Sequence, residues 1–224
     1  MKKLILIILT IPQVILAQFS IQNLENSARK GNINHQKQLG YIYLYGQNNV
    51  EMDPTKAFKW FLRAAEQGDS EMQGLIGALY FQGIGVDKNY NKAFTWTKLS
   101  ADNGFLEAQS SIASMYIFGL GVEKNENEAF KWTKTAAERG HLKAQTTLGS
   151  LYYEGKIVKQ DLEQAYKWTL LAAEQGWPHA QVSIGYFYLQ GIWVQPNYQQ
   201  AKYWFNKACT QKYQAGCDYL KNIP

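Results

Sequence analysis

The chain has 224 residues, enough for one large domain or two small ones. Hydrophobic residues make up 46% and charged residues 18%, a composition that excludes a disordered chain and a charge-rich coiled coil. The formal net charge is +5, but Lys2 and Lys3 supply two of those charges and no basic block occurs elsewhere, so the sequence does not favour a nucleic-acid partner.

The N-terminal segment has the layout of a secretory signal peptide. A cationic start at Lys2 and Lys3 is followed by a mostly apolar stretch over residues 4–16 and then by Ala17. The stretch is short for a membrane span, and a proline interrupts it. We therefore expect residues 1–17 to be removed and the mature protein to be secreted or periplasmic, without an integral membrane segment.

A period of 36 residues organises most of the remaining chain. The clearest column is tryptophan, at Trp60, Trp96, Trp132, Trp168 and Trp204. Three glycine and tyrosine columns keep the same step, at Gly68, Gly104, Gly140 and Gly176, at Gly83, Gly119, Gly155 and Gly191, and at Tyr80, Tyr116, Tyr152 and Tyr188. A period of this length predicts a tandem array in which each unit buries its apolar side against its neighbours.

Each repeat contains one helix that carries the tryptophan. In the first such helix the apolar positions follow an i, i+3, i+4, i+7, i+8 pattern, at Ala57, Trp60, Phe61, Ala64 and Ala65. The start of this helix is marked in every copy by a residue whose side chain can cap it, namely Asp53, Asn89, Asn125, Asp161 or Asn197. The glycine column that begins at Gly68 marks the stop.

The other helix of each repeat carries small residues and the tyrosine. Residues 144–152 are an example, with Ala144, Leu148 and Tyr152 on one face. Glycine in the middle of a helix lowers its stability by about 0.5–1 kcal/mol relative to alanine. The recurrence of glycine at Gly77, Gly149 and Gly185 therefore predicts close approach of a neighbouring helix.

The columns Leu-Gly-x-x-Tyr, Gly-x-Gly-Val, Lys-Ala-x-x-Trp and Ala-Ala-x-x-Gly resemble the Sel1-like repeat family, which is related to tetratricopeptide repeats. The resemblance implies an all-α fold, a right-handed α-solenoid of about five helix-turn-helix repeats over residues 32–212. A leading helix over residues 18–31 and a closing helix and tail over residues 213–224 would flank this array. The expected units are 32–67, 69–103, 105–139, 141–175 and 177–212.

The two cysteines support a narrower resemblance. Lys207-Ala208-Cys209 and Gly216-Cys217 are similar to the paired cysteines of the Helicobacter cysteine-rich Sel1-like proteins, which bridge neighbouring helices. This resemblance implies a disulfide between Cys209 and Cys217, and an exported chain would keep it oxidised. No histidine or third cysteine is near them, so we expect no metal site, and the sequence predicts no cofactor.

A groove is the site that the resemblance favours. In tetratricopeptide-like arrays the first helix of each repeat lines the concave surface, where aromatic side chains can hold an extended peptide or a sugar ring. This geometry places on the wall Tyr41, Leu44, Tyr45, Ala78, Phe81, Gln82, Ser114, Ile117, Phe118, Ser150, Tyr153, Glu154, His179, Tyr186, Leu189 and Gln190. Ordinary packing between helices is the alternative role for each of them.

The favoured function is a non-enzymatic scaffold without catalytic residues, whose partner is a protein or peptide of the cell envelope or of a host. The alternative rests on Ser27-Ala28-Arg29-Lys30, an S-x-x-K match. Some Helicobacter relatives are described as penicillin-binding or weak β-lactamase proteins, which implies a binder of β-lactams or peptidoglycan fragments with weak hydrolase activity at Ser27 and Lys30. The companion motifs S-D-N and K-T-G are absent. The sequence does not fix an oligomeric state.

Overall fold

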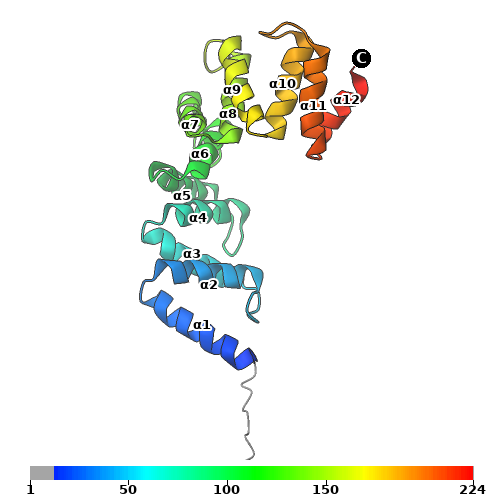
Figure 1. Cartoon of the computed structure of the whole chain (residues 1–224). Coiled ribbons are helices and arrows are strands. Elements are labelled where there is room, and N and C mark those ends of the chain that lie inside the picture. Colours follow the sequence, from blue (N-terminus) through cyan, green and yellow to red (C-terminus); the bar gives the residue numbers. More distant parts are fainter. Residues whose placement is uncertain (1–12, 224) are drawn as a thin grey trace, which may run out of the picture. The chain divides into compact units, whose positions relative to one another are not determined.

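The computed structural model of the chain describes residues 13–223, and the side chains from residue 21 onward (Figure 1). Most of the expected signal peptide therefore lies outside the described residues. Over the described part of the chain, twelve α-helices follow one another and no strand occurs, which confirms the all-α prediction. The helices are α1 Gln13–Arg29, α2 Ile33–Tyr45, α3 Pro54–Glu66, α4 Ser70–Gln82, α5 Tyr90–Asp102, α6 Leu106–Phe118, α7 Glu126–Glu138, α8 Leu142–Glu154, α9 Leu162–Glu174, α10 Pro178–Gln190, α11 Tyr198–Thr210 and α12 Gln214–Asn222.

The chain divides into two compact units, residues 1–99 and 100–224. In the first unit α1 packs against α2, α2 against α3, and α3 against α4. In the second unit every helix from α6 to α12 packs against the next one along the chain, and α10 also contacts α12. Contacts between consecutive helices are what a stack of helical hairpins requires.

The expected capping residues begin the tryptophan helices. The side chains of Asp53, Asn125, Asp161 and Asn197 each accept a hydrogen bond from the backbone N–H three residues later. Asn89 does the same for the N–H of Lys92. These bonds satisfy amides of the first turn that have no partner within the helix. The preceding helices end at glycines in the left-handed conformation, at Gly46, Gly83, Gly119, Gly155 and Gly191.

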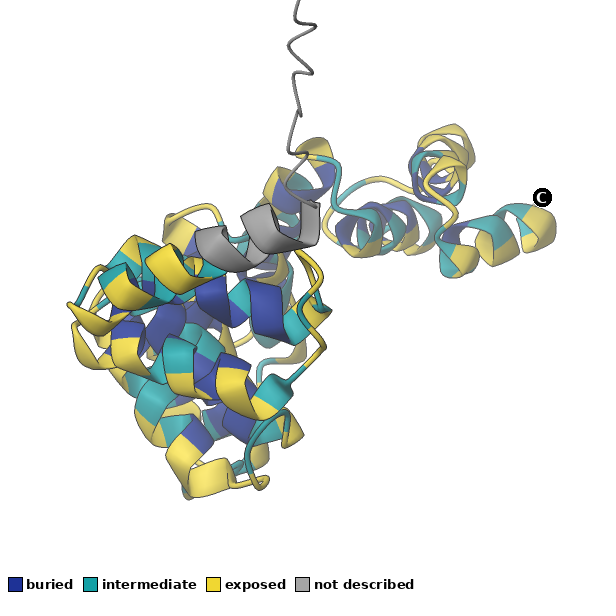
Figure 2. Ribbon diagram, turned by 90° about the horizontal axis from the view of Figure 1, so that it is seen from below, coloured by how far each residue is buried: buried dark blue, intermediate teal, exposed yellow. Residues whose placement is uncertain are grey.

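The core lies between the repeats, as the tandem pattern predicts. In Figure 2 buried residues occupy the sides of the helices that face one another, and exposed residues occupy the outer sides. Trp204 on α11 is only 7% exposed and packs on the alanine pair Ala172 and Ala173 of α9 and on Ala180 and Ile184 of α10. A buried indole removes a large apolar area from water, so Trp204 joins the hairpin of α10 and α11 to α9.

The mid-helix glycines occupy sites of close approach, as expected. A Cβ atom added to Gly149 on α8 would lie 2.3 Å from Oγ1 of Thr169 on α9. One added to Gly185 on α10 would lie 2.5 Å from the ring of Phe205 on α11. Both distances are too short for non-bonded atoms, so a side chain at either position would force the facing side chain to move.

A buried glutamine joins the turns of successive helices, a role that the repeat columns did not reveal. Gln145 on α8 donates from Nε2 to the carbonyl oxygen of Ala137 at 3.2 Å. Its Oε1 accepts a hydrogen bond from Nε2 of Gln175, at the end of α9, at 3.1 Å. The same side-chain bond to the alanine eight residues earlier is made by Gln36, Gln73, Gln109 and Gln181.

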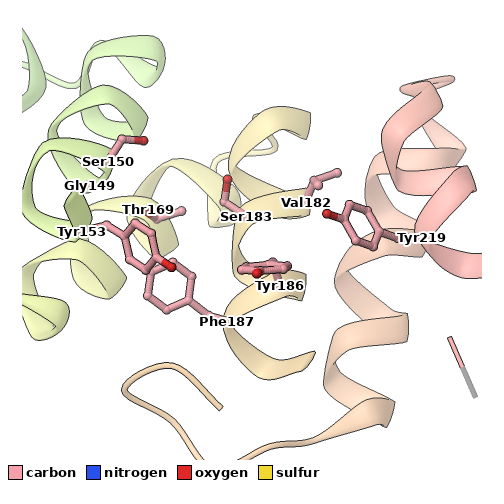
Figure 3. A pocket seen from close by; sticks show the side chains of 9 residues that line it. All are labelled: Gly149, Ser150, Tyr153, Thr169, Val182, Ser183, Tyr186, Phe187 and Tyr219. Atoms are coloured by element: carbon pink, nitrogen blue, oxygen red, sulfur yellow. The ribbon is translucent and has the colours of Figure 1, made fainter. Parts of the chain in front are cut away.

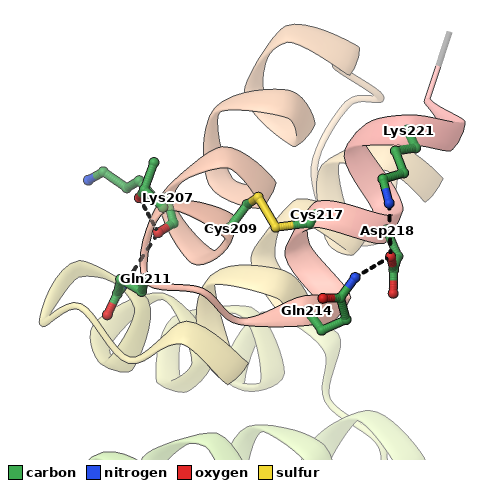
Figure 4. Close-up of a disulfide and its surroundings, with 8 residues drawn as sticks. Lys207, Cys209, Gln211, Gln214, Cys217, Asp218 and Lys221 are labelled. Carbon is green, nitrogen blue, oxygen red and sulfur yellow. Dashed lines mark hydrogen bonds and ion pairs between the residues drawn. A yellow bond between two sulfur atoms is a disulfide. The ribbon is translucent and has the colours of Figure 1, made fainter.

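The last position of this column carries a covalent bond instead. Cys217 on α12 is joined to Cys209 on α11, again eight residues earlier (Figure 4). The cysteine stands where the glutamine stands in the earlier repeats, and Cys209 stands where the alanine stands. The disulfide that the resemblance implied is therefore present, and it replaces a recurring hydrogen bond.

Candidate binding pocket

None of the sixteen predicted wall residues is buried. Some are strongly exposed, with Tyr45 at 64% and Phe118 at 65%. The packing columns beside them, such as Leu39, Ile76 and Leu148, are fully buried. The predicted wall residues therefore lie on the solvent side of the first helix of each repeat.

In the first unit the wall aromatics contact one another along and between helices. The rings of Tyr41 and Tyr45 stack at 6.3 Å on α2, and Tyr41 also meets Phe61 of α3 edge-on at 5.0 Å. On α4, Phe81 meets Tyr90 of α5 at 5.1 Å. Partial burial, reinforced by the nearby Glu71 carboxylate, raises the pKa of Tyr41, so its hydroxyl stays protonated and able to donate.

In the second unit three of the predicted residues line a pocket of about 320 Å³ (Figure 3). These are Ser150 and Tyr153 on α8 and Tyr186 on α10. The other lining residues, which were not predicted from the sequence, are Gly149, Thr169, Val182, Ser183, Phe187 and Tyr219. Ser114, Ile117, Phe118, Glu154, His179, Leu189 and Gln190 are not among the residues that line it.

Helical spacing explains which side chains reach the pocket. On α10 the lining positions are 182, 183, 186 and 187, which form one face at i, i+1, i+4 and i+5. On α8 the same face presents Gly149, Ser150 and Tyr153. Because Gly149 has no side chain, Thr169 of α9 also lines the pocket, although Thr169 itself is buried. Of the residues predicted on α10, at positions 179, 186, 189 and 190, only Tyr186 lies on this face, and Val182 and Ser183 were not predicted.

Tyr219 of α12 forms the far wall of the pocket. Its ring stacks on Phe205 of α11, with centroids 4.6 Å apart, and meets Tyr186 of α10 at 6.4 Å. The disulfide between Cys209 and Cys217 joins α12 to α11 half a turn earlier on the same short helix. The disulfide that joins α11 to α12 therefore also holds one wall of the pocket.

The pocket contains no acidic or basic side chain among its nine lining residues. The hydroxyls of Ser150, Thr169 and Ser183 each donate to a backbone carbonyl of their own helix, at 3.2, 2.7 and 3.1 Å. Their oxygens still offer lone pairs to a ligand. No hydrogen bond joins the hydroxyl of any of the three lining tyrosines to another described residue, so these groups remain free to donate.

His179 belongs to a different aromatic cluster, at the start of α10. Its Nδ1 lies 3.0 Å from the hydroxyl of Tyr213, and its ring stacks on that of Trp177 at 5.3 Å. This contact joins the beginning of α10 to the residue that precedes α12. The structure therefore separates His179 from the pocket tyrosines with which it was grouped.

The serine of the S-x-x-K segment lies against a histidine of the next helix. The hydroxyl of Ser27 lies 2.7 Å from Nδ1 of His35 on α2. Helix α1 ends at Arg29, so Lys30 lies beyond it, with an exposed side chain. The contact that the structure gives Ser27 is thus with a histidine that the motif does not include.

Neither a metal site nor a membrane span is found in the described part of the chain. Among the described residues, no three histidine, cysteine, aspartate or glutamate side chains come together as metal ligands would. None of the described helices has both the length and the apolar character needed to cross a bilayer.

The repeats match a known family model. The Sel1 repeat model matches residues 36–69, 70–105, 106–141, 142–177 and 178–213. The chain belongs to the Sel1 repeat family. Each Sel1 repeat, as matched, contains one glycine–tyrosine helix and the tryptophan helix that follows it, which is the division expected from the sequence.

Known structures show the same Sel1 fold. A protective antigen of uropathogenic Escherichia coli strains displaying an SLR fold is 31% identical, with a TM-score of 0.82 over 93% of this chain. The chain spans about half of that antigen, 47% of its length. A Sel1 repeat protein of Oxalobacter formigenes is also similar, 26% identical, with a TM-score of 0.80 over 93% of this chain and 86% of its own.

One curated relative has a known cellular role of its own. The ERAD-associated E3 ubiquitin-protein ligase component HRD3A of Arabidopsis thaliana is 39% identical over 64 residues. The match covers 29% of this chain and only 9% of the relative. So short a match leaves the function of this chain to its own residues.

Proposed function

We propose that this Sel1 repeat protein is a non-enzymatic scaffold that binds a protein or peptide through the exposed aromatic face of its glycine–tyrosine helices. The pocket between α8, α10 and α12 is the anchor of that site. The observation that carries the proposal is the set of three tyrosines there, each between 37% and 39% exposed. Partly exposed tyrosines, held by ring contacts, offer large contact area at low entropic cost, which is typical of binding hot spots.

The uncharged lining favours a peptide over a β-lactam as the ligand. A β-lactam antibiotic carries a carboxylate, and a carboxylate that loses water without a cation or N–H donors is strongly destabilised. The nine lining residues supply no cation. A segment of polypeptide can enter the pocket with uncharged side chains and leave its charged residues in water.

Export of the mature chain is part of the proposal. Its supports are the signal-peptide pattern of residues 1–17 and the disulfide between Cys209 and Cys217, since disulfides persist in oxidising compartments. A mass measurement on protein recovered from the native cell envelope or medium tests this point. Loss of residues 1–17 is the expected result, and an intact N-terminus with free thiols would contradict it.

Peptide selection tests the binding site. A displayed peptide library is selected on the oxidised wild-type protein and counter-selected on the double variant Tyr153→Ala/Tyr186→Ala. The matched control is Tyr198→Ala/Tyr203→Ala, which removes two exposed tyrosines of α11 that do not line the pocket. We expect selected peptides to bind the control as they bind the wild type and to lose binding to the pocket variant. Equal binding to all three proteins would contradict the proposal.

Hydrolysis of β-lactams is the alternative, and one assay separates it from the scaffold. We expect the purified protein to leave nitrocefin unchanged. Turnover that disappears in Ser27→Ala would support a hydrolase instead, and the contact between Ser27 and His35 would then make His35→Ala the next variant to measure.

A further inference from the structure

The last repeat, residues 178–213, differs from the other four in its charge and in the aromatic side chains that it exposes. We infer that one side of this repeat binds the surface of a bilayer that contains anionic phospholipid. The surface concerned is the α11 face, which consists of Trp193 in the loop between α10 and α11 and of Tyr198, Lys202, Tyr203 and Lys207 on α11. None of these residues lines the pocket, so the inference goes beyond the proposed function.

Positive charge is concentrated in the last repeat. With histidine neutral, the first four matched repeats contain four basic residues against four acidic, three against three, four against five and four against four. Their formal charges are therefore 0, 0, −1 and 0. Residues 178–213 contain Lys202, Lys207 and Lys212 and no acidic residue, which gives +3. A local excess of this kind attracts an anionic partner to one part of the chain.

The low number of carboxylates can be traced to particular positions of α11. The helices α3, α5, α7 and α9 each end at an acidic residue, whereas α11 ends at Thr210. On α9, Lys167 forms an ion pair with Glu163 of the same helix. Over the described residues, none of the three lysines of the last repeat forms an ion pair. Their ammonium groups are therefore available to an external anion.

Trp193 is the one tryptophan with an exposed side chain. All seven tryptophans lie in the part of the chain that the structure describes, and Trp193 is 55% exposed while the other six are buried or partly buried. Its φ of 62° lies in the left-handed region, which bulky residues rarely adopt, and Gly85 and Gly121 hold the same position in two earlier repeats. Neither packing nor backbone preference accounts for a tryptophan here, so its ring is available for an external contact.

The tyrosines of the α11 face continue the aromatic surface along the helix. Tyr198 and Tyr203 are each about half exposed, and they lie with Lys202 on one side of α11. The Nζ atom of Lys207 lies 4.8 Å from the centre of the Tyr203 ring. In three earlier repeats a lysine stands where Tyr203 stands, as at Lys167. The last repeat thus has an exposed ring in place of a charged residue and still keeps an excess of positive charge.

A lipid surface fits this combination of side chains. Tryptophan and tyrosine rings are enriched at the headgroup level of bilayers, and lysine stems lie along apolar surface while their ammonium groups stay among the headgroups. The exposed rings lie on a loop and on a single helix, and a bilayer takes up such side chains without a complementary hollow. An acidic polypeptide would pair with the lysines but would also need an apolar hollow for Trp193. Charge and ring exposure together therefore favour the lipid surface.

Vesicle sedimentation tests the inference on the oxidised protein, purified in the form that cells accumulate. One set of vesicles is pure phosphatidylcholine, and the other contains about one third phosphatidylglycerol, which supplies the anionic surface. A decaglutamate peptide is the third probe and represents an acidic polypeptide. Where residues 4–16 are retained, they contribute equally in every variant, so differences between variants report on the α11 face.

The variants separate charge from aromatic contact. Lys202→Gln/Lys207→Gln removes two positive charges from the α11 face. The matched control is Lys143→Gln/Lys159→Gln, which removes two positive charges from exposed positions of the preceding repeat. Trp193→Gly restores the glycine of the earlier repeats, so the loop should keep its conformation. Circular dichroism of each variant checks that the helices are retained.

We expect the wild type to bind the phosphatidylglycerol vesicles and to bind neither pure phosphatidylcholine nor decaglutamate at the same concentrations. Loss of two lysines from the α11 face should weaken vesicle binding about tenfold or more, because each contributes about 1 kcal/mol near an anionic leaflet. The control pair should change binding by less than about threefold, because its lysines lie away from the leaflet. Trp193→Gly should weaken binding about threefold or more and remove the blue shift of tryptophan emission that accompanies it.

Four results would overturn the inference. They are absence of binding to the phosphatidylglycerol vesicles, equal losses in the two lysine variants, unchanged vesicle binding in Trp193→Gly, and binding of decaglutamate in preference to vesicles. The pocket variant Tyr153→Ala/Tyr186→Ala should bind vesicles as the wild type does, and Tyr198→Ala/Tyr203→Ala should bind them more weakly. Because these two variants have the opposite effects on peptide binding, failure of this inference is distinguishable from failure of the proposed function.

Discussion

In the second unit, the connection between α11 and α12 is held by a different kind of bond from the connection between α7 and α8. Between α7 and α8 a buried glutamine, Gln145, bonds to the carbonyl of Ala137 and accepts from Gln175. Between α11 and α12 the corresponding link is the covalent bond from Cys209 to Cys217. The difference shows how a repeating hydrogen-bond site becomes a disulfide site when one alanine and one glutamine are replaced.

The amount of buried surface explains why the last turn benefits from the stronger link. Helix α12 has nine residues, and of these only Gly216 is buried, whereas five residues of α10 are buried. A helix this short is not stable alone in water and depends on its contacts. Because Tyr219 lies on α12, the disulfide also fixes one wall of the pocket.

Removing the packing of the tryptophan column should have the largest effect. Trp204→Ala leaves a cavity among Ala172, Ala173, Ala180 and Ile184 and should lower the free energy of unfolding by about 3–5 kcal/mol. The disulfide remains in this variant. A urea titration followed by circular dichroism measures the change, and a loss below about 1 kcal/mol would show that the covalent link, and not packing, secures the end of the array.

Removing the disulfide should have the next largest effect and should be local. Cys209→Ser/Cys217→Ser opens the short loop that the disulfide closes. It should lower the stability of the packing of α12 on α11 by about 2–3 kcal/mol. Hydrogen exchange should then speed up in α12 and remain unchanged in α8. The matched control is Cys209→Ala/Cys217→Gln, which places between α11 and α12 the alanine and glutamine found in the earlier repeats. Its side-chain hydrogen bond should restore about 1 kcal/mol of the lost stability. Identical exchange in both variants would contradict the equivalence of the two links.

Breaking an internal link should cost less than breaking the terminal one. Gln145→Ala removes two side-chain hydrogen bonds. The carbonyl of Ala137 keeps the N–H of Gly140 and the amide of Gln175 keeps the carbonyl of Leu171, so the free energy of unfolding should fall by only about 1–2 kcal/mol. The urea midpoint of this variant, compared with that of an exposed substitution on the same helix such as Ser150→Ala, gives the value. A change no larger than that of the exposed control would show that the glutamine column does not stabilise the array.

The smallest expected effect is a pH dependence of stability that arises at the connection between α7 and α8. His141 caps α8 by accepting from the N–H of Ala144 at Nδ1, which requires the neutral ring. Burial is the main cause that lowers the pKa of His141 in the folded protein. The unfolded chain then binds the proton more readily, so stability is complete above a pH of about 6.5 and falls as the solution becomes more acidic.

The variant His141→Asn isolates this effect. Asparagine can make the same capping bond without titrating. We expect the urea midpoint of the wild type to fall from pH 7 to pH 5 by more than that of the variant. Equal slopes for both proteins would show that His141 does not contribute to the acid sensitivity.

Much of the fold could be predicted from the sequence because its signals repeat. These signals are the tryptophans from Trp60 to Trp204, the capping residues such as Asp161 and the mid-helix Gly149. Each depends on local geometry, so an interpretation made for one repeat applies to the others. The helices, the residues that begin them and the division into repeats could therefore be predicted from these recurring residues. The glutamine column was visible as well, but its two hydrogen bonds depend on how three helix ends meet, which the column alone does not show.

The candidate site was less predictable because it depends on side-chain direction. The position of Tyr153 and Tyr186 on the outer face follows from the repeat register. Val182 and Ser183 were missed because the residues predicted on α10, at positions 179, 186, 189 and 190, are not the one helical face that lines the pocket. Tyr219 was missed because α12 lies outside the repeat columns, and only its packing on Phe205 brings its ring to the pocket.

The central claim is that the tyrosine pocket is the ligand-binding site. A carbon–proton spectrum of protein labelled at tyrosine rings tests it directly, with signals assigned by single tyrosine-to-phenylalanine variants. On addition of a peptide selected on the wild-type protein, we expect the signals of Tyr153, Tyr186 and Tyr219 to shift and those of Tyr45 and Tyr203 to stay in place. Shifts at Tyr45 or Tyr203 with unchanged pocket signals would contradict the account.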